Sequence, residues 1–354
     1  MEGMVKPNKN FWTDKRVLVT GHTGFKGSWL CAILSSYGTK LMGYSLPAET
    51  DSLNKLLNIE GLVEHVEGDL LDHDSLKKAI LEFQPDIVIH MAAQALVSES
   101  YLKPIETYST NLIGTLHLLE ILKKLDKEVF ALMITTDKVY ENRELEKPFK
   151  EEDKLGANDP YSTSKTCMEL LIESHIRSFK EEFTSKTIQV VRAGNVIGGG
   201  DMANNRLLPD LIRSVFSGKP FMMRNPEAVR PWQHVFDVLN AYLLLVENGL
   251  GTKKFEQWNI SPDTEDVFKV SDIVNRVRQV FPNLVVRTEK SDFYEANHLR
   301  LDSEKIRNNL GWKPQYDVRR SITEALEWYR AANSESIDIK AFSFAQIKAF
   351  FDAK

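Results

Sequence analysis

The first half of the chain alternates between short, almost continuous apolar runs and longer stretches in which apolar residues recur every three or four positions. The apolar runs predict strands at residues 16–20, 40–44, 63–67, 87–91, 129–135 and 188–192. The helical spacing is clearest at Leu112, Leu116, Leu119 and Leu122. Short apolar strands separated by helices are typical of a parallel sheet with helices on both faces. The pattern therefore predicts an α/β fold, a doubly wound parallel sheet of the Rossmann type.

After Gly194 the pattern loosens, and turn residues gather at 198–200 and 219–231. We therefore expect residues 11–193 to form the Rossmann domain, and residues 194–233 and 251–335 to form a smaller C-terminal substrate-binding lobe. Residues 234–250, a long apolar-periodic helix, are expected to return to the main domain. Residues 336–354 predict a terminal amphipathic helix.

Composition narrows the class of protein. The 354 residues are 42% hydrophobic and 27% charged, with a net charge of −5, which argues against a chain that coats nucleic acid or an anionic membrane. No apolar run reaches the roughly 18 residues of a membrane span. Two cysteines, Cys31 and Cys167, predict free thiols, and eight scattered histidines predict no metal site. The polar beginning of the chain carries no secretion signal, so a cytoplasmic protein is expected.

A glycine-rich loop follows the first strand and reads Gly21-His22-Thr23-Gly24-Phe25-Lys26-Gly27. Glycines at this spacing let the backbone approach a pyrophosphate at the amino end of a helix, where free N–H groups favour an anion. The alternative, an ordinary glycine-rich turn, is disfavoured because a strand precedes the loop and a helix follows it. After the second strand, Tyr44-Ser45-Leu46-Pro47 offers neither the acid typical of NAD sites nor an arginine for NADP. Asp69 is a candidate for the adenine, and NAD is favoured.

Two clusters predict chemistry. Tyr161 and Lys165 stand four residues apart on one helix face, and a tyrosine, whose pKa is normally about 10, can act as a base beside an ammonium. Thr136, Asp137 and Lys138 follow the strand at 129–135, at the edge where parallel sheets bind ligands. Thr136 suits a sugar hydroxyl. Asp137 and Lys138 offer the acid and base that an elimination needs; the alternative is a solvated surface pair.

These residues resemble a known family. From Phe11 to about Tyr329 the chain is similar to the nucleotide-sugar branch of the extended short-chain dehydrogenases, and within it to the CDP-glucose 4,6-dehydratases. The resemblance rests on the glycine-rich loop, on His90-Met-Ala-Ala-Gln94, on Thr136-Asp-Lys138, on Arg192-Ala-Gly-Asn-Val-Ile-Gly-Gly-Gly-Asp201 and on Arg230-Pro-Trp-Gln-His234.

The resemblance implies an NAD-dependent reaction in which a sugar nucleotide is oxidised at C4, loses water across C5 and C6, and receives the hydride back at C6. Tyr161 would be the base at the 4-hydroxyl and Asp137 the acid at the 6-hydroxyl. Lys138 stands where related enzymes have a glutamate base, and its role is either that base or orientation of the substrate. The catalytic set is then Thr136, Asp137, Lys138, Tyr161 and Lys165. The cofactor set is Gly21, Thr23, Gly24, Phe25, Lys26, Gly27, Asp69, Leu70, Ala92, Ala93, Gln94, Tyr161 and Lys165.

For the substrate diphosphate the candidates are Asn195, Arg206 and Arg230, because arginine binds such anions bidentately. The alternative is that the arginines pair with acids such as Asp210 or Asp237. Gln233 and His234 are expected to support the lobe. Family resemblance also implies a homodimer through a four-helix interface, for which residues 107–122 and 166–179 offer apolar faces.

Other functions stay open from the sequence. A nucleotide-sugar 4-epimerase would use the same loop and the same Tyr161 and Lys165, but it needs no acid at C6. A 4,6-dehydratase acting on another nucleotide sugar would carry the same catalytic set. A non-enzymatic dinucleotide-binding scaffold would not require Thr136, Asp137 and Lys138 together with Tyr161 and Lys165.

Overall fold

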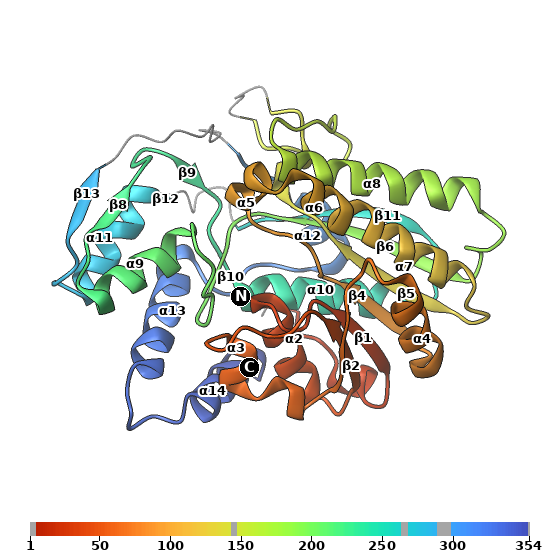
Figure 1. Cartoon of the computed structure of the whole chain (residues 1–354), viewed down its shortest axis with the longest axis horizontal. Coiled ribbons are helices and arrows are strands. Elements are labelled where there is room, and N and C mark those ends of the chain that lie inside the picture. The colour runs from red at the N-terminus through yellow and green to blue at the C-terminus, as the bar shows by residue number, and fades with distance from the viewer. Residues whose placement is uncertain (1–4, 143–146, 263–267, 289–298, 353–354) are drawn as a thin grey trace.

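The central feature of the fold is a parallel sheet of seven strands in the order β11-β6-β5-β4-β1-β2-β3 (Figure 1). The computed structural model describes residues 5–142, 147–262, 268–288 and 299–352. The strands are β1 (Arg16–Thr20), β2 (Lys40–Ser45), β3 (Glu64–Glu67), β4 (Ile87–His90), β5 (Val129–Ile134), β6 (Lys186–Ala193) and β11 (Phe255–Ile260). The strand order reverses between β1 and β4, which confirms the doubly wound Rossmann-type sheet.

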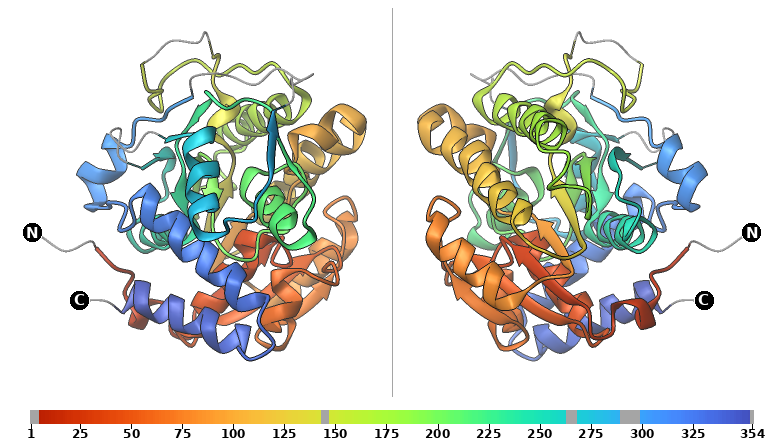
Figure 2. Two further views of the ribbon diagram at one scale, coloured as in Figure 1. Left: turned by 90° about the vertical axis from the view of Figure 1, so that its left-hand side faces the viewer. Right: turned by 90° about the vertical axis from the view of Figure 1, so that its right-hand side faces the viewer.

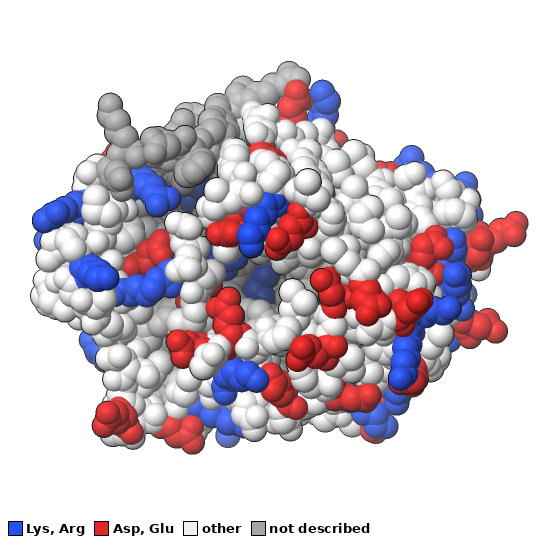
Figure 3. Space-filling view, viewed as in Figure 1, with Lys and Arg blue, Asp and Glu red and all other residues white. Residues whose placement is uncertain are grey.

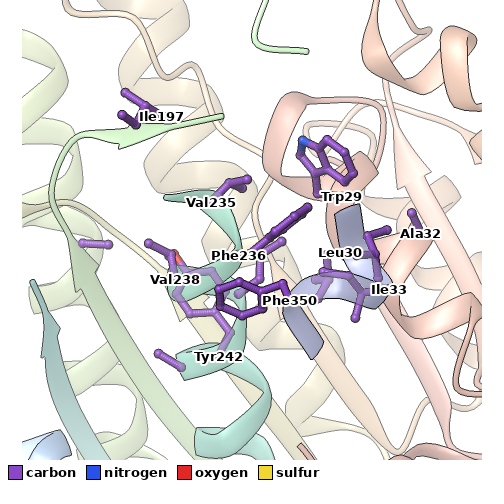
Figure 4. Packing of buried hydrophobic residues seen from close by; sticks show 14 of the residues in the cluster. Trp29, Leu30, Ala32, Ile33, Ile197, Val235, Phe236, Val238, Tyr242 and Phe350 are labelled. Atoms are coloured by element: carbon purple, nitrogen blue, oxygen red, sulfur yellow. The ribbon is translucent and has the colours of Figure 1, made fainter. Parts of the chain in front are cut away.

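Helices cover both faces of this sheet (Figure 2). On one side pack α2 (Phe25–Ser35), α10 (Val235–Gly249) and α14 (Ile339–Phe351); on the other pack α4 (His73–Phe83), α7 (Gly114–Lys123) and α8 (Pro160–Ser178). Each face of the sheet has its own apolar core, and strand β5 shows why the apolar runs are continuous. Phe130, Leu132 and Ile134 pack into the core on the α2 and α10 side, while Ala131 and Met133 pack into the core on the α4 and α7 side. Figure 4 shows Phe350 of the terminal helix beside Phe236 of α10, their ring centroids 5.5 Å apart.

Six further helices among the described residues complete the main body. They are α1 (Lys9–Trp12), α3 (Leu53–Leu57), α5 (Val97–Leu102), α6 (Pro104–Tyr108), α12 (Glu304–Leu310) and α13 (Val318–Ala332), with 3-10 turns at Ile59–Gly61 and Asp137–Val139 and a π-helical turn at Ser109–Ile113. Among the described helices none is long and apolar enough to cross a bilayer.

A second group of elements lies to one side of the carboxyl ends of the strands (Figure 1, left). It contains α9 (Leu207–Ser217) and α11 (Val270–Val280), with β8 (Phe221–Met223) paired to β13 (Val286–Thr288) and β9 (Val229–Arg230) paired to β12 (Phe268–Lys269). A further pair, β7 (Val196–Ile197) and β10 (Gln233–His234), stands at its junction with the sheet. Residues 263–267 and 289–298 of the predicted lobe, and the last two of the predicted terminal helix, lie outside the described residues.

Strand β11 departs from the sequence analysis, which placed residues 251–335 in the lobe. Residues 255–260 instead pair with β6 and form the last strand of the main sheet. The strand carries Glu256, Gln257 and Asn259, so its apolar pattern is broken. Asn259 is nevertheless fully buried, because its side chain is hydrogen-bonded inside the protein.

Candidate active site

The glycine-rich loop is tightly folded against the end of β4. Gly21 has a φ of +74°, and a Cβ there would lie 2.7 Å from the backbone nitrogen of Ala92. A Cβ on Gly27 would lie 2.3 Å from the carbonyl oxygen of Gly21. Gly24 precedes the first residue of α2 and offers no side-chain cap to its free N–H groups. The loop therefore leaves a helix amino terminus open to an anion such as a dinucleotide pyrophosphate.

The remaining predicted cofactor residues follow the carboxyl ends of β1 to β4. Thr23 Oγ1 lies 2.7 Å from Ser45 Oγ after β2. Asp69 after β3 is exposed and accepts the N–H of Leu71 at 2.9 Å, while Leu70 is buried. The side chain of Gln94 is engaged within the protein, because its amide donates to Thr107 at 2.8 Å and its oxygen accepts the N–H of Leu96.

The predicted catalytic and substrate residues come together in one cavity of about 490 Å³. In Figure 3 the surface is hollowed between the second group of elements and the main sheet, with basic side chains visible inside the hollow. The predicted residues that line the cavity are Phe25, Lys26, Ala93, Thr136, Asp137, Lys138, Tyr161, Lys165, Asn195, Arg206 and Arg230. Those outside its lining are Gly21, Thr23, Gly24, Gly27, Asp69, Leu70, Ala92 and Gln94.

The turn Asp137–Val139 after β5 carries the acid and the lysine. Asp137 is only 1% exposed, and its Oδ1 accepts from Thr136 Oγ1 at 3.0 Å and from Lys138 Nζ at 3.1 Å. Its Oδ2 is buried and has no hydrogen-bond partner among the described residues. The side chain of Lys138 is 31% exposed. One carboxylate oxygen is thus held in place, and the other is left for a group that enters the cavity.

Tyr161 and Lys165 lie on the first turns of α8, which begins at Pro160 behind an Asp159 cap that accepts the N–H of Ser162 at 2.9 Å. Burial raises the pKa of the Tyr161 phenol to about 12, and the hydrogen bond with Thr136 opposes this effect. Burial, with the nearby charge of Lys26, lowers the pKa of Lys165 to about 7. In these surroundings both groups favour their neutral forms.

The predicted substrate residues face the cavity from the other side. Arg206 precedes α9 and its NH1 lies 2.9 Å from Asp201 Oδ2. Neither acid considered in the alternative takes that place, because Asp210 pairs with Arg213, and Asp237 accepts the backbone N–H of Gln315. Asn195, directly before β7, and Arg230, in β9, also line the cavity.

The residues expected to support this region are buried and bonded within the protein. Gln233 donates its amide to the carbonyl of Ile260 at 3.2 Å, and His234 caps α10 by accepting the N–H of Phe236 at 3.2 Å.

Some cavity residues were not predicted. Asp201 holds Arg206; it ends the motif Arg192–Asp201 on which the family resemblance rests, but no role was predicted for it. Lys26, by contrast, is one of the predicted cofactor residues; it donates to the hydroxyl of Tyr242 in α10 at 3.4 Å, and burial lowers the pKa of Lys26 to about 8. At the far end the lining is Phe221, Met222, Arg224, Asn225, Trp232, Val270 and Leu299. Only three-dimensional packing joins these distant segments.

Comparison with known proteins identifies the family. The family model described as GDP-mannose 4,6 dehydratase matches residues 18–325. The chain belongs to this family. A CDP-glucose 4,6-dehydratase of Salmonella typhimurium is 41% identical over 333 residues, covering 92% of this chain and 93% of that protein. Membership of the GDP-mannose 4,6 dehydratase family confirms the resemblance found in the motifs.

More distant relatives include enzymes of two kinds. A dTDP-glucose 4,6-dehydratase of Haemophilus influenzae is 28% identical over 90% of this chain and 99% of its own length. A UDP-glucose 4-epimerase of Mycoplasma genitalium is also 28% identical, over 89% of this chain and 96% of its own length.

Solved structures share the fold of this member of the GDP-mannose 4,6 dehydratase family. A dTDP-glucose 4,6-dehydratase of Bacillus anthracis in complex with NAD superposes with a TM-score of 0.77 at 24% identity, covering 90% of this chain and 97% of that one. A UDP-glucose 4-epimerase of Thermotoga maritima with UDP-glucose has a TM-score of 0.77 at 22% identity, covering 90% and 99%. At these identities the likeness speaks for the fold alone.

Proposed function

We propose that the protein dehydrates CDP-glucose to CDP-4-keto-6-deoxyglucose, with NAD as a cofactor that is regenerated in each turnover. The observation that carries this proposal is the buried Asp137, with one unpartnered oxygen, in the same cavity as Tyr161 and Lys165. An epimerase has no use for an acid beside its tyrosine, whereas a dehydration needs one. The 41% identity to a CDP-glucose 4,6-dehydratase supports the same choice and the cytidine nucleotide.

The cofactor fits the residues at the glycine-rich loop. The close approach of Gly21 and Gly27 and the uncapped start of α2 suit a pyrophosphate, and Asp69 after β3 suits the adenosine end. NAD bound there supplies a hydride acceptor for C4 and a hydride donor for C6. Thr23, Gly24, Phe25, Lys26, Leu70, Ala92, Ala93 and Gln94 complete this proposed binding set.

The chain's own residues move the protons. Tyr161 acts as a phenolate, which the nearby ammonium of Lys165 stabilises, and becomes a phenol when it takes the proton of the 4-hydroxyl as the C4 hydrogen leaves as hydride. The 4-ketone acidifies C5–H, and that proton passes to water in the cavity. Asp137 gives its proton to the departing 6-hydroxyl, so one water is lost while a C5=C6 double bond forms. The hydride then returns to C6 and a proton returns to C5. Solvent carries the proton held by Tyr161 back to Asp137, so the cycle closes with no net oxidation.

Lys138 stands next to the acid and touches it. Its Nζ lies 3.1 Å from Asp137 Oδ1, so it holds that oxygen in place and leaves Oδ2 for the substrate. Orientation of Asp137 and the substrate is therefore the role we propose.

The second group of elements is proposed to hold the nucleotide. Arg206, fixed by Asp201, and Arg230 present guanidinium groups that suit a diphosphate, and Asn195 adds an amide. We propose residues 194–233 and the parts of 251–335 outside β11, α12 and α13 as this substrate lobe. The free thiols Cys31 and Cys167 suit a reducing compartment, which supports a cytoplasmic site of action in deoxysugar synthesis, of the kind that serves lipopolysaccharide O-antigen.

We also propose a homodimer through helices of two subunits. Leu102 of α5, Ile105 of α6 and Leu170 of α8 are 75%, 82% and 51% exposed, an apolar surface that water solvates poorly. These helices adjoin the faces at 107–122 and 166–179 predicted for a four-helix interface.

The test is to incubate the purified protein with NAD and, in parallel, with CDP-, UDP-, dTDP- and GDP-hexoses, and to follow products by mass spectrometry and proton NMR. Loss of one water, a new C6 methyl signal and no accumulation of NADH are expected, fastest with CDP-glucose. A product of unchanged mass would replace the proposal with a 4-epimerase. No turnover of any sugar would contradict an enzymatic function in this class.

A further inference from the structure

A buried ion pair lies behind the proposed catalytic residues, away from the cavity lining. Glu169 of α8 and Arg192 of β6 are 3% and 2% exposed, and Arg192 Nε lies 2.9 Å from Glu169 Oε2. Neither residue lines the cavity. The pair therefore has no direct contact with a ligand in the cavity. Its role is inferred from the residues that are hydrogen-bonded to it.

The pair holds both ends of the turn that carries Asp137. Before the turn, Thr135 Oγ1 donates to Glu169 Oε1 at 2.6 Å. After it, the hydroxyl of Tyr140 accepts from Arg192 NH1 at 2.6 Å. The four residues between these anchors are Thr136, Asp137, Lys138 and the buried Val139.

The same pair is tied to the other half of the site. Glu169 stands four residues after Lys165 and eight after Tyr161, so all three lie on one face of α8. The pair also reaches the last strand of the sheet, because the Tyr140 hydroxyl donates to Asn259 Oδ1 of β11 at 2.7 Å. One ion pair thus links the turn after β5 that carries Asp137, the helix that carries Tyr161, and β11.

We propose that the Glu169–Arg192 pair positions the two halves of the catalytic set against each other, with Thr135 and Tyr140 as its contacts to the Asp137 turn. The inference rests on the proposed function, because the reaction for which these residues are positioned is the proposed dehydration. Buried ion pairs contribute little net stability but fix the groups bonded to them, so geometry is the effect to measure. A displacement of about 1 Å in a reacting group can lower a rate by roughly a hundredfold.

The first test compares two buried threonines. Thr135→Val removes the hydroxyl that contacts Glu169 and leaves the ion pair intact. Thr187 lies near the start of β6, far along the strand from Arg192, and is 2% exposed. Thr187→Val removes a hydroxyl that accepts the N–H of Lys253 at 2.9 Å. We expect similar losses in thermal midpoint for both variants. Only Thr135→Val should lower kcat, by about tenfold or more, with KM for the sugar nucleotide within about twofold of wild type.

The second test uses the other anchor. Tyr140→Phe keeps the ring, which stacks on Phe149 with centroids 4.8 Å apart, and removes only the hydroxyl bonded to Arg192. Because both anchors hold one turn, the double variant Thr135→Val/Tyr140→Phe should lose less in kcat than the product of the two single losses. If the two losses in kcat simply multiply in the double variant, the two contacts act independently, and the proposal that they hold the turn together is contradicted.

A third readout does not depend on turnover, so it separates this inference from the proposed function. Amide hydrogen exchange should rise in both the 136–140 and the 161–166 peptides of Thr135→Val, and in neither peptide of Thr187→Val. The inference is overturned if Thr135→Val keeps kcat within about twofold of wild type, or if Thr187→Val loses as much. If wild type turns over no sugar nucleotide, the proposed function fails, and the exchange result alone decides whether the pair positions the turn.

Discussion

At the scale of single residues, the site holds groups in surroundings that oppose the charges their roles require. Burial keeps Tyr161 protonated and makes the ammonium of Lys165 less stable than in water. The phenolate that the proposed mechanism requires therefore needs a positive charge brought close to Tyr161, such as the nicotinamide ring of a bound cofactor. We expect Tyr161 to stay an unreactive phenol in the cofactor-free protein.

Tyr161→Phe should abolish ketone formation while the fold and cofactor binding persist. The variant loses only the hydroxyl that takes the proton, so a drop in kcat of about a thousandfold or more is expected. Circular dichroism and NAD titration control for the fold and the cofactor. Turnover near the wild-type rate would show that another group is the base.

Asp137→Asn should separate oxidation from dehydration. An amide cannot protonate the departing 6-hydroxyl, so C4 oxidation should proceed and reduced cofactor should accumulate on the protein. Loss of water should slow by at least about a hundredfold. Stopped-flow absorbance of the reduced cofactor and NMR of the C6 methyl protons measure the two stages. A normal rate of methyl formation would remove Asp137 from the role of acid.

The pKa of Lys165 has a consequence for stability. Since burial lowers this pKa from the ordinary 10.5 to about 7, the unfolded chain holds more protons than the folded one between these values. The contribution of Lys165 to stability therefore rises with pH in that window and changes little below pH 7. Denaturant unfolding of the cofactor-free protein should show wild type gaining on the order of 1–2 kcal/mol relative to Lys165→Met between pH 7 and 9. Parallel curves for the two proteins would mean that Lys165 is not desolvated.

At the scale of elements, the glycine-rich loop and α2 act as one unit. Gly27→Ala would bring a Cβ within 2.3 Å of the Gly21 carbonyl, so the loop must open and the start of α2 must shift. We expect a loss of about 1–3 kcal/mol in stability and at least a tenfold weaker affinity for NAD by calorimetry.

The matched control for this loop is Gly218→Ala at the end of α9. There φ is +69° and no atom lies within 4 Å of the added Cβ. It should cost about 1 kcal/mol of stability through backbone strain alone. Its affinity for NAD should stay unchanged. Equal weakening in both variants would trace the effect to general destabilisation.

The sequence predicted the strands well where apolar packing alone buries their side chains. Strand β1 matches its predicted residues 16–20 and β5 ends one residue earlier than predicted, because both are apolar on both faces. Strand β6, which also buries Gln189 and Arg192, begins two residues before and ends one residue after the predicted 188–192. Strand β11 was missed because Asn259 is buried by hydrogen bonds rather than by apolar contacts. For the site, local spacing revealed Tyr161 and Lys165, whereas the contact of Glu169 with Arg192 depends on pairing between segments that only the fold brings together.

At the scale of the whole molecule, the exposed apolar residues of α5, α6 and α8 favour the proposed association of two subunits. In the proposed dimer Ile105, 82% exposed, is covered by the second subunit. Ile105→Asp would place a charge in that contact and should shift the protein to monomer in sedimentation experiments, with an unchanged thermal midpoint extrapolated to low concentration. Lys103→Asp, on an exposed polar position nearby, is the control. A monomeric wild type at micromolar concentration would contradict the proposed interface.

The position of β11 sets an order for synthesis. A nascent chain that has emerged as far as Gly249 already contains Thr136, Asp137, Lys138, Tyr161 and Lys165. It still lacks Asn259, to which the hydroxyl of Tyr140 donates. Because a domain folds as a unit and β11 completes its sheet, the turn that carries Asp137 gains its contact with β11 only after a strand made about a hundred residues after Tyr161 has left the ribosome. A chain arrested before β11 would therefore hold every proposed catalytic residue and still lack the geometry that the proposed reaction requires.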